Sequence, residues 1–342
     1  MNAQVSESSS EIAVPGYTET DYNTLERTPL PAPKMMTIED IERFKQQILT
    51  AADLALNVAG FDFFELHGAH GYLLDQFLNA GTNTRTDQYG GSYENRFRLI
   101  AELLELLIPK YPGRIAIRIS PHSGTGFFDA NDPKPLELYT EVYRRLAKYD
   151  LAYLLCTEPR WNPAHQGNPE TDPFWNLPMF SAQFTKVFRE TNKTTVIIGA
   201  GGFTADNSFE TMKIENDRPY DAVGYGRFYI SNPDIVFRLK HYLPFNRYNR
   251  SSFYTVAPFG GDFNAGYTDY PTFEQIVKAK LGPDADLAEV IANPDTIAKL
   301  IELTKDDLYP LIPLDIIGKT RSTAEREGSE SATAAEEAPA SE

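Results

Sequence analysis

Two histidines and a tyrosine lie within six positions of one another in the segment His67-Gly-Ala-His70-Gly-Tyr72. Imidazoles donate hydrogen bonds, and a tyrosine hydroxyl can deliver a proton. Three such groups can converge on one carbonyl oxygen and polarise an electron-poor substrate. The same residues could also bind a metal, or be polar groups satisfied at a strand end. Without an HExxH pattern or a nearby cysteine, the sequence predicts no metal site.

A second candidate site consists of two glycine-containing turns. Gly201 and Gly202 follow the apolar run TVIIGA, while Gly226 and Arg227 follow the run DAVGY. Exposed main-chain N–H groups and an arginine suit an anionic phosphate. Each turn alone could also contain glycine simply because a tight turn requires its backbone conformation. Their position after the last two predicted strands favours phosphate, because barrels commonly bind it after strands seven and eight.

Arg118 lies inside the apolar run IAIRIS, where a guanidinium must find an anionic or accepting partner. A ring edge that takes up negative charge on reduction, as that of a flavin does, would be such a partner. A buried ion pair with Glu65 is the alternative.

Regular elements must hold these residues in place. A helix is predicted from Thr37, as N-cap, to about Ala59, with Asp40 in its first turn. Short segments rich in β-branched and aromatic residues then predict five strands, Phe61–Leu66, Arg114–Ser120, Ala152–Thr157, Thr195–Ala200 and Asp221–Tyr225. The helical stretches between them are Tyr93–Leu107, Pro135–Lys148 and Ser181–Arg189.

This alternation predicts right-handed βαβ units and a parallel sheet. A run such as TVIIG is apolar throughout, as strands covered on both faces are, but a barrel and a doubly wound open sheet share that pattern. Both folds place their active sites at the carboxyl ends of the strands. His67 begins where the first predicted strand ends, so we expect the site there.

Composition limits the classes of partner. The chain has 342 residues and a formal net charge of −16, from 48 acidic and 32 basic residues. An acidic surface argues against nucleic acid and anionic membranes. No apolar run reaches the ~20 residues of a membrane helix, and no secretory signal opens the sequence, which predicts a cytoplasmic protein. Cys156, the only cysteine, is expected to pack in a strand.

The two ends differ from the middle. Residues 1–34 are polar and end in TPLPAPK, which predicts a poorly ordered leader. Apolar residues at helical spacing predict a second helical region from Asp286 to Leu314. The expected organisation is a leader at 1–34, the β/α part at 35–275, a helical extension at 276–318 and a disordered acidic tail at 319–342.

At this point the chain resembles a known family. The stretches FDFFELHGAHGYLLDQF, from Phe61, and TNTRTDQYGGSYENR, from Thr82, are similar to the signature of old yellow enzymes and oxophytodienoate reductases. The motifs that begin at Arg118, Glu158 and Asp269 follow in the family's order. The resemblance runs from about Leu30 to Glu274.

The resemblance implies an FMN-bound (β/α)8 barrel in which NADPH or NADH reduces the flavin. The flavin then passes hydride to the β-carbon of an α,β-unsaturated carbonyl compound. It also implies the roles of individual residues: His67 and His70 bind the substrate oxygen, Tyr72 donates a proton, Arg118 lies against the pyrimidine edge of the flavin, Gly201, Gly202, Gly226 and Arg227 hold the FMN phosphate, and Arg160 and Tyr254 line the substrate pocket.

The sequence also departs from this family. Members carry three β/α units before the segment that resembles residues 37–67, and one βαβ unit alone takes ~30 residues. We therefore expect five of eight strands and an unclosed barrel, whose open edges need a cover. The helices from Asp286 to Leu314, or a second subunit in a homo-oligomer, are the candidates.

Two other interpretations stay open. The chain could be a catalytically impaired remnant or a fragment with weak or no flavin binding, which the shortened barrel favours and the intact histidines and tyrosine oppose. An enzyme for phosphate ligands on an open sheet, without flavin, explains the glycine turns but leaves Arg118 and the paired histidines unassigned.

Overall fold

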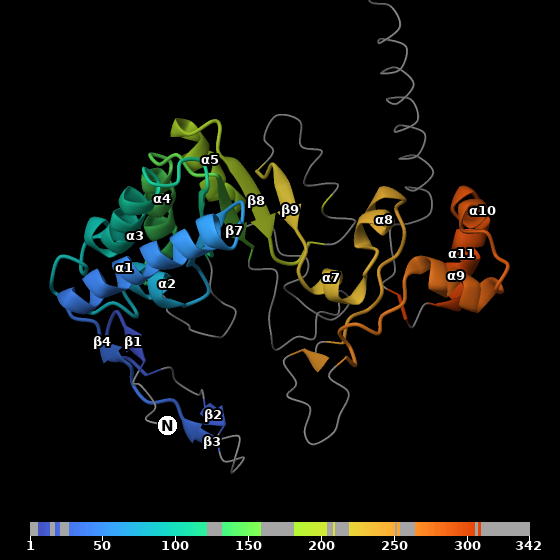
Figure 1. The fold of residues 1–342 in the computed structure, drawn as a ribbon, viewed down its shortest axis with the longest axis horizontal. Helices are drawn as coiled ribbons and strands as arrows, with labels where there is room; N and C mark the ends of the chain where they lie inside the picture. Colours follow the sequence, from blue (N-terminus) through green and yellow to red (C-terminus); the bar gives the residue numbers. More distant parts are fainter. Residues whose placement is uncertain are drawn as a thin grey trace, which may run out of the picture. The chain divides into compact units, whose positions relative to one another are not determined.

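The fold was analysed in a computed structural model (Figure 1). The structure describes residues 6–13, 18–20, 27–121, 132–158, 181–203, 208, 219–249, 252–253, 264–304 and 307–308. The chain divides into two compact units. The first comprises residues 1–203 and 211–224, and the second comprises residues 204–210 and 225–342.

The first unit is built on a parallel sheet of five strands. They are β5 (Phe64–Gly68), β6 (Ile115–Ile119), β7 (Tyr153–Thr157), β8 (Val196–Ala200) and β9 (Ala222–Gly224). Each strand pairs with the next one in the chain, in the order β5-β6-β7-β8-β9. The five predicted strands and their parallel pairing are confirmed.

This strand order separates the two folds that the sequence left open. A doubly wound sheet reverses direction at a switch point, whereas a barrel winds one way around. Sequential order with right-handed crossovers places all connecting helices on one face of the sheet. The described part is therefore barrel-like, and within it β5 and β9 are edges of an unclosed sheet.

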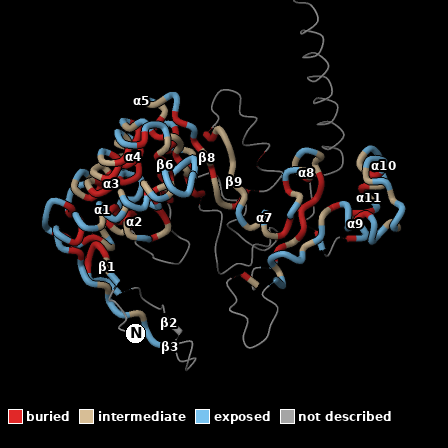
Figure 2. Tube along the Cα trace, viewed as in Figure 1, coloured by how far each residue is buried: buried red, intermediate tan, exposed pale blue. Residues whose placement is uncertain are grey.

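Three helices cover that face: α3 (Tyr93–Leu107), α4 (Pro135–Leu146) and α5 (Ala182–Thr191). All three lie within two residues of their predicted bounds. Figure 2 shows buried residues concentrated on α3 and α4. The sheet face toward these helices carries buried apolar side chains at every second strand position: Leu66, Ile115, Ile117, Ile119, Leu154, Cys156 and Ile197. The other sheet face carries the polar residues of interest, as period-two alternation requires.

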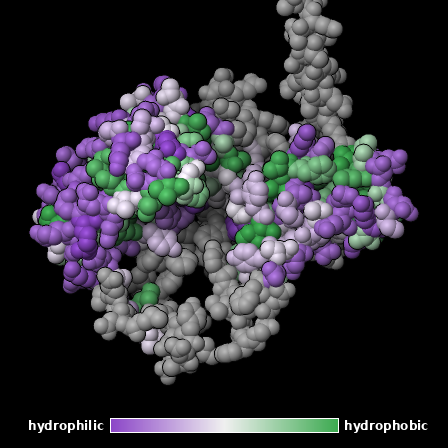
Figure 3. All heavy atoms as spheres, viewed as in Figure 1, coloured by the Kyte–Doolittle hydropathy of each residue, from purple (hydrophilic) through white to green (hydrophobic). Residues whose placement is uncertain are grey.

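A helix precedes the sheet, as predicted. α1 (Ile38–Asp53) begins with a capping box, in which the Thr37 side chain accepts from the N–H of Asp40 and the Asp40 carboxylate accepts from the N–H of Thr37. One π-helical turn (Leu54–Val58) continues it. Over α1, α3 and α4 the surface seen in Figure 3 is mainly hydrophilic. This is the outer face of the helical layer.

The first strand begins three residues later than predicted. Ladder pairing starts at Phe64, whose N–H donates to the carbonyl of Arg114 at 2.9 Å. Phe61 and Phe63 are 64% and 52% exposed and lie outside the strand. Aromatic residues favour strands in general, but register is set by the partner strand.

The N-terminal segment contains structure that the prediction of a poorly ordered leader did not include. β1 (Glu7–Ser8) pairs in parallel with β4 (Lys34–Met35), and β2 (Thr18–Thr20) pairs antiparallel with β3 (Arg27–Pro29). Ser9 is fully buried, and its hydroxyl donates to the carbonyl of Thr82 at 2.7 Å. Side-chain hydrogen bonds thus seat a polar segment against the barrel part.

The second unit is helical in its described residues. It contains α7 (Arg227–Ser231), α8 (Ile235–Lys240), α9 (Phe273–Leu281), α10 (Leu287–Ala292) and α11 (Pro294–Leu303). The last two lie where a second helical region was expected. α9 crosses the expected boundary between residues 275 and 276. The acidic tail at 319–342 lies outside the described residues.

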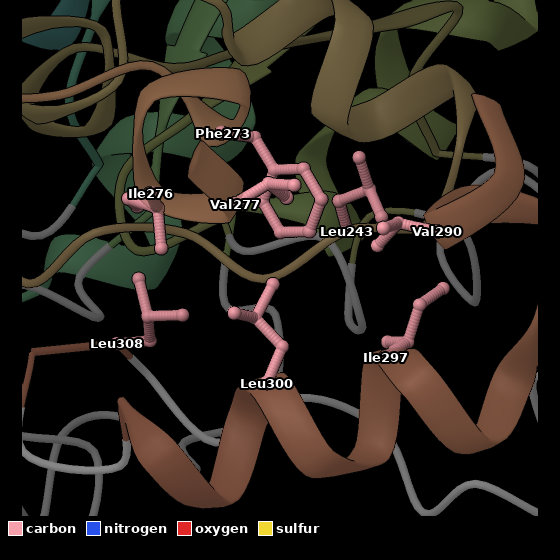
Figure 4. Packing of buried hydrophobic residues seen from close by; sticks show 8 residues of the cluster. All are labelled: Leu243, Phe273, Ile276, Val277, Val290, Ile297, Leu300 and Leu308. Carbon is pink, nitrogen blue, oxygen red and sulfur yellow. The ribbon is translucent and has the colours of Figure 1, made fainter. Parts of the chain in front are cut away.

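The core of this unit comes from its last three helices and two flanking segments (Figure 4). Its buried members are Leu243, Phe273, Ile276, Val277, Val290, Ile297, Leu300 and Leu308. Burying a single leucine or isoleucine side chain stabilises by about 1.5–3 kcal/mol. These helices therefore have a core of their own. Whether they cover an edge of the sheet stays a prediction.

Candidate active site

The histidine pair and the tyrosine lie together at the carboxyl end of β5. The imidazole centroids of His67 and His70 are 5.5 Å apart, and the centroid of His67 is 5.1 Å from that of Tyr72. His67 lies opposite Arg118 in the register of β5 and β6. Residues opposite one another on neighbouring strands share a sheet face. The structure thus brings together four predicted site residues, three of them from one short segment.

Both imidazoles are held in the neutral form. Burial, the positive charge of Arg118 and then His67 lower the pKa of His70 to about 3. Desolvation by the surrounding protein, and then Arg118, also lower the pKa of His67. Neither imidazole ring hydrogen-bonds to another described residue. Each can therefore offer one N–H to a ligand at neutral pH.

The loop after β5 has an uncommon backbone. His70 has φ 58° and Gly71 has φ 74°, so two consecutive residues are left-handed. A non-glycine residue in this region costs about 1–3 kcal/mol and persists where its surroundings fix it. The N–H of His70 donates to the hydroxyl of Ser120 at 2.8 Å, and the N–H of Tyr72 donates to the carbonyl of Ala69 at 3.2 Å. These bonds hold the loop in place.

Arg118 extends from β6 on the same face. Its Nε donates to the hydroxyl of Thr157 at 3.1 Å, and burial lowers its pKa while the charge of Glu65 raises it. In the described part of the chain no ion pair joins Glu65 to Arg118, so the structure does not support the alternative of a buried pair. Among described residues, the terminal nitrogens of Arg118 have no hydrogen-bond partner. They remain able to bind an acceptor that is not part of the described chain.

The glycine turn after β8 has the backbone that glycine makes possible. Gly201 has φ 101° and Gly202 has φ 69°. A Cβ on Gly201 would lie 2.5 Å from the carbonyl oxygen of Glu158. Glu158 is fully buried, and its carboxylate accepts from the N–H of Ser181 at 3.0 Å and from the hydroxyl of Tyr220. The turn therefore rests on a fixed support.

The other two residues predicted for phosphate lie in the second unit. Gly226 precedes α7, and nothing lies within 4 Å of an added Cβ there. Arg227 donates to the hydroxyl of Tyr248 at 2.6 Å, and its guanidinium carbon lies 5.2 Å from the centroid of that ring. Tyr248 was not anticipated, since a buried tyrosine in a loop gives no sequence signal. Arg160 and Tyr254 lie outside the described residues.

Among the described residues, no group of three or more histidine, cysteine, aspartate or glutamate side chains is arranged to hold a metal ion. No helix in this part of the chain has the length and apolar character needed to cross a membrane.

Comparison with known proteins defines the class. The model of the family described as NADH:flavin oxidoreductase / NADH oxidase matches residues 3–246, and the chain belongs to this family. The predicted resemblance to old yellow enzymes and oxophytodienoate reductases is thereby confirmed. The match begins at residue 3, whereas the sequence motifs carried the resemblance only from about Leu30.

Individual relatives agree with this assignment. The chain is 36% identical over 253 residues to 12-oxophytodienoate reductase 2 of Arabidopsis thaliana, covering 74% of this chain and 62% of that protein. It is 34% identical over 256 residues to a probable inactive dehydrogenase, easA, of Claviceps fusiformis, covering 72% of this chain and 62% of the relative. The chain thus spans about three fifths of the length of these curated relatives.

A solved structure is similar as well. Morphinone reductase in complex with tetrahydroNAD superposes with a TM-score of 0.62 at 29% identity, covering 79% of this chain and 67% of the other. The predicted (β/α)8 fold class is confirmed at this level, with a sheet of five strands that is not closed in the described residues. The predicted cofactors, FMN and a nicotinamide reductant, agree with the family.

Proposed function

We propose that this chain is an FMN-dependent NAD(P)H oxidoreductase that reduces the C=C bond of α,β-unsaturated carbonyl compounds. The observation that carries the proposal is the gathering of His67, His70 and Tyr72 beside Arg118 at the carboxyl end of β5. Family membership supports the oxidoreductase class. The substrate class is inferred from the side chains.

The described residues fit a flavin. Among the described residues, the terminal nitrogens of Arg118 have no hydrogen-bond partner, and Arg118 lies on the face that carries the histidines. These nitrogens suit an acceptor that gains negative charge on reduction. Bound FMN would supply the redox chemistry, taking hydride from NAD(P)H and giving it to the alkene. Gly201 and Gly202 offer a turn with main-chain N–H groups of the kind that holds phosphate. Gly226 and Arg227 are proposed for the phosphate on sequence alone.

The histidines would bind and orient the substrate. Two neutral imidazoles donating to one carbonyl oxygen draw electrons from the conjugated alkene and make its β-carbon more electrophilic. Because the pKa of His70 is about 3, this site would favour a neutral carbonyl over a carboxylate, which prefers cationic partners. His67 and His70 would thus activate the substrate without transferring a proton.

Tyr72 would complete the reaction. Hydride addition at the β-carbon leaves a pair of electrons at the α-carbon, which a proton must neutralise. The Tyr72 side chain is 48% exposed and its ring lies tilted against that of His67, so its hydroxyl can deliver that proton and recover it from solvent.

Turnover in deuterated water tests this function. With NADPH and 2-cyclohexenone, the product should be cyclohexanone with one deuterium at the α-carbon, because the hydroxyl of Tyr72 exchanges with solvent. In ordinary water, NADPH carrying deuterium at the transferred position of its nicotinamide should place deuterium at the β-carbon. A protein that binds FMN and oxidises NADPH but forms no saturated ketone would refute the proposed substrate class.

An impaired protein is the second candidate. One curated relative at 34% identity is itself described as a probable inactive dehydrogenase. The described sheet also has edges at β5 and β9. On this alternative the chain would bind FMN weakly or not at all, and titration of the protein with FMN, followed by flavin fluorescence, separates the two candidates.

A further inference from the structure

The backbone N–H and C=O of Gly71 are both held by two successive residues of α2 (Leu73–Leu78). Its N–H donates to Oδ2 of Asp75 at 2.7 Å, and its carbonyl accepts from Nε2 of Gln76 at 2.8 Å. Gly71 lies between His70 and Tyr72. Two side chains therefore fix the two peptide groups that flank the Cα of Gly71, one shared with a proposed substrate ligand and the other with the proposed proton donor.

The carboxylate of Asp75 is buried and engaged in hydrogen bonds. It is fully buried and accepts three hydrogen bonds, from the N–H of Gly71, from Nδ2 of Asn79 at 2.9 Å and from the hydroxyl of Tyr139 at 3.0 Å. A carboxylate accepts only, so three donors facing it suit its ionised form. Burial nevertheless raises its pKa to about 6. A buried charge that has no ion pair with another described residue is costly, which points to a function beyond packing.

Gln76 is held in turn by the N-terminal strand. The hydroxyl of Ser8 in β1 donates to Oε1 of Gln76 at 2.6 Å. An amide that accepts with its oxygen has its nitrogen free to donate, so this bond fixes which atom faces Gly71. The buried N-terminal segment is thus connected, through one side chain, to the loop that carries the proposed catalytic groups.

We propose that Asp75 and Gln76 are positioning residues that hold the backbone of Gly71 on both sides of its Cα and thereby aim the side chains of His70 and Tyr72. The catalytic part of this inference rests on the proposed function, whereas the structural part does not. The left-handed backbone at His70 is the reason that such support is needed. Without it, the loop would relax and the hydroxyl of Tyr72 would lose its position relative to the substrate.

Asp75→Asn is the informative change, since it keeps the size and replaces one acceptor by a donor. If the amide nitrogen takes the Oδ2 position, it faces the N–H of Gly71, and two donors repel. If it takes the Oδ1 position, it faces Nδ2 of Asn79 instead. Tyr139→Phe is the matched control, because it also removes one buried hydrogen bond of Asp75 but leaves the bond to Gly71 intact.

Amide exchange measured by mass spectrometry on peptides spanning residues 69–73 reads the loop directly and requires no cofactor. In Asp75→Asn, exchange there should speed up by about tenfold or more, as expected when a hydrogen bond to a charged group is lost. Tyr139→Phe should stay within about threefold of the wild type. Equal protection in the wild type and Asp75→Asn would overturn the positioning role.

A double-mutant cycle tests the catalytic consequence. Flavin reoxidation by 2-cyclohexenone should slow by about tenfold or more in Asp75→Asn, while flavin reduction by NADPH stays close to the wild type. If Asp75 acts through Tyr72, adding Asp75→Asn to Tyr72→Phe should cause little further loss. Fully additive losses would contradict action through Tyr72. A wild type without enone reduction would defeat the proposed function, while amide exchange would still decide the positioning role.

Discussion

Gly201→Ala is the substitution whose cost the structure defines most sharply. The new Cβ would lie 2.5 Å from the carbonyl oxygen of Glu158, a separation that real Cβ atoms essentially never show. Glu158 cannot move aside easily, because its N–H donates to the carbonyl of Ala200 at 2.7 Å and its carboxylate is also held. The φ of 101° adds strain for any residue with a Cβ.

The expected loss in the free energy of unfolding follows from the steric clash and the backbone strain. A left-handed backbone costs an alanine about 1–2 kcal/mol, and overpacking a fixed neighbour costs about 1–3 kcal/mol. Together they predict that Gly201→Ala lowers the free energy of unfolding by about 2–5 kcal/mol. Gly113→Ala is the control in the same unit, since φ there is 69° and nothing lies within 4 Å of the added Cβ. It should cost about 1–2 kcal/mol at most.

Urea unfolding of both variants, followed by circular dichroism, measures the difference. FMN titration of the same samples tests the proposed role of the turn, and Gly201→Ala should weaken FMN binding while Gly113→Ala should not. Equal stability losses in the two variants would refute the steric reasoning. Unchanged FMN affinity in Gly201→Ala would refute the assignment of this turn to the phosphate.

Three other predictions concern the loop and its neighbours. Tyr72→Phe should slow flavin reoxidation by an enone by about 10²–10⁴-fold and leave reduction by NADPH nearly unchanged, which stopped-flow absorbance separates; equal losses in both half-reactions would contradict proton donation. Arg118→Met should raise the pKa of His70, because a nearby positive charge is removed while burial remains, and an NMR titration of the imidazole would follow it; an unchanged pKa would contradict that coupling. Asp75 should make the protein less stable as pH rises, since its folded pKa of about 6 exceeds the ordinary 3.8. Its contribution is complete below about pH 4 and lost through about pH 6, a change of about 3 kcal/mol, and urea unfolding of Asp75→Asn should show no such loss if the assignment is right.

The alternation of short apolar strands and amphipathic helices made most of the first unit predictable. Tyr93–Leu107 matches its predicted bounds, and its regular apolar spacing corresponds to the buried face of the helix. The barrel-like order of the strands needed the structure or the family resemblance. The apolar periodicity of the sequence indicates how each strand is buried, but it does not identify the strand that pairs with it.

Other features depend on contacts that no local pattern encodes. Phe61 and Phe63 look like strand residues, yet pairing with β6 begins only at Phe64. Ser9 lies in a polar stretch typical of disorder, but hydrogen bonds to residues more than 60 positions away bury it. Sequence distance hides such partners, which is why the N-terminal segment was expected to lack order.

In the candidate site, too, some features were predictable from the sequence and others needed the structure. The spacing of His67, His70 and Tyr72 indicated a common site, and the structure brings them together. The partner of Arg118 could not be chosen between Glu65 and a ligand, because both would satisfy a buried guanidinium. Asp75 was not singled out at all, since one carboxylate in a helical segment reads as a solvated position until its burial is known.

Anaerobic visible absorption spectroscopy of the purified protein with added FMN tests the central claim most directly. The account predicts a bound flavin whose absorption near 450 nm, the usual flavin band, bleaches on addition of NADPH and returns on addition of 2-cyclohexenone, since the protein supplies the site for each transfer. A protein that binds no flavin at saturating FMN would contradict the account and leave the impaired alternative.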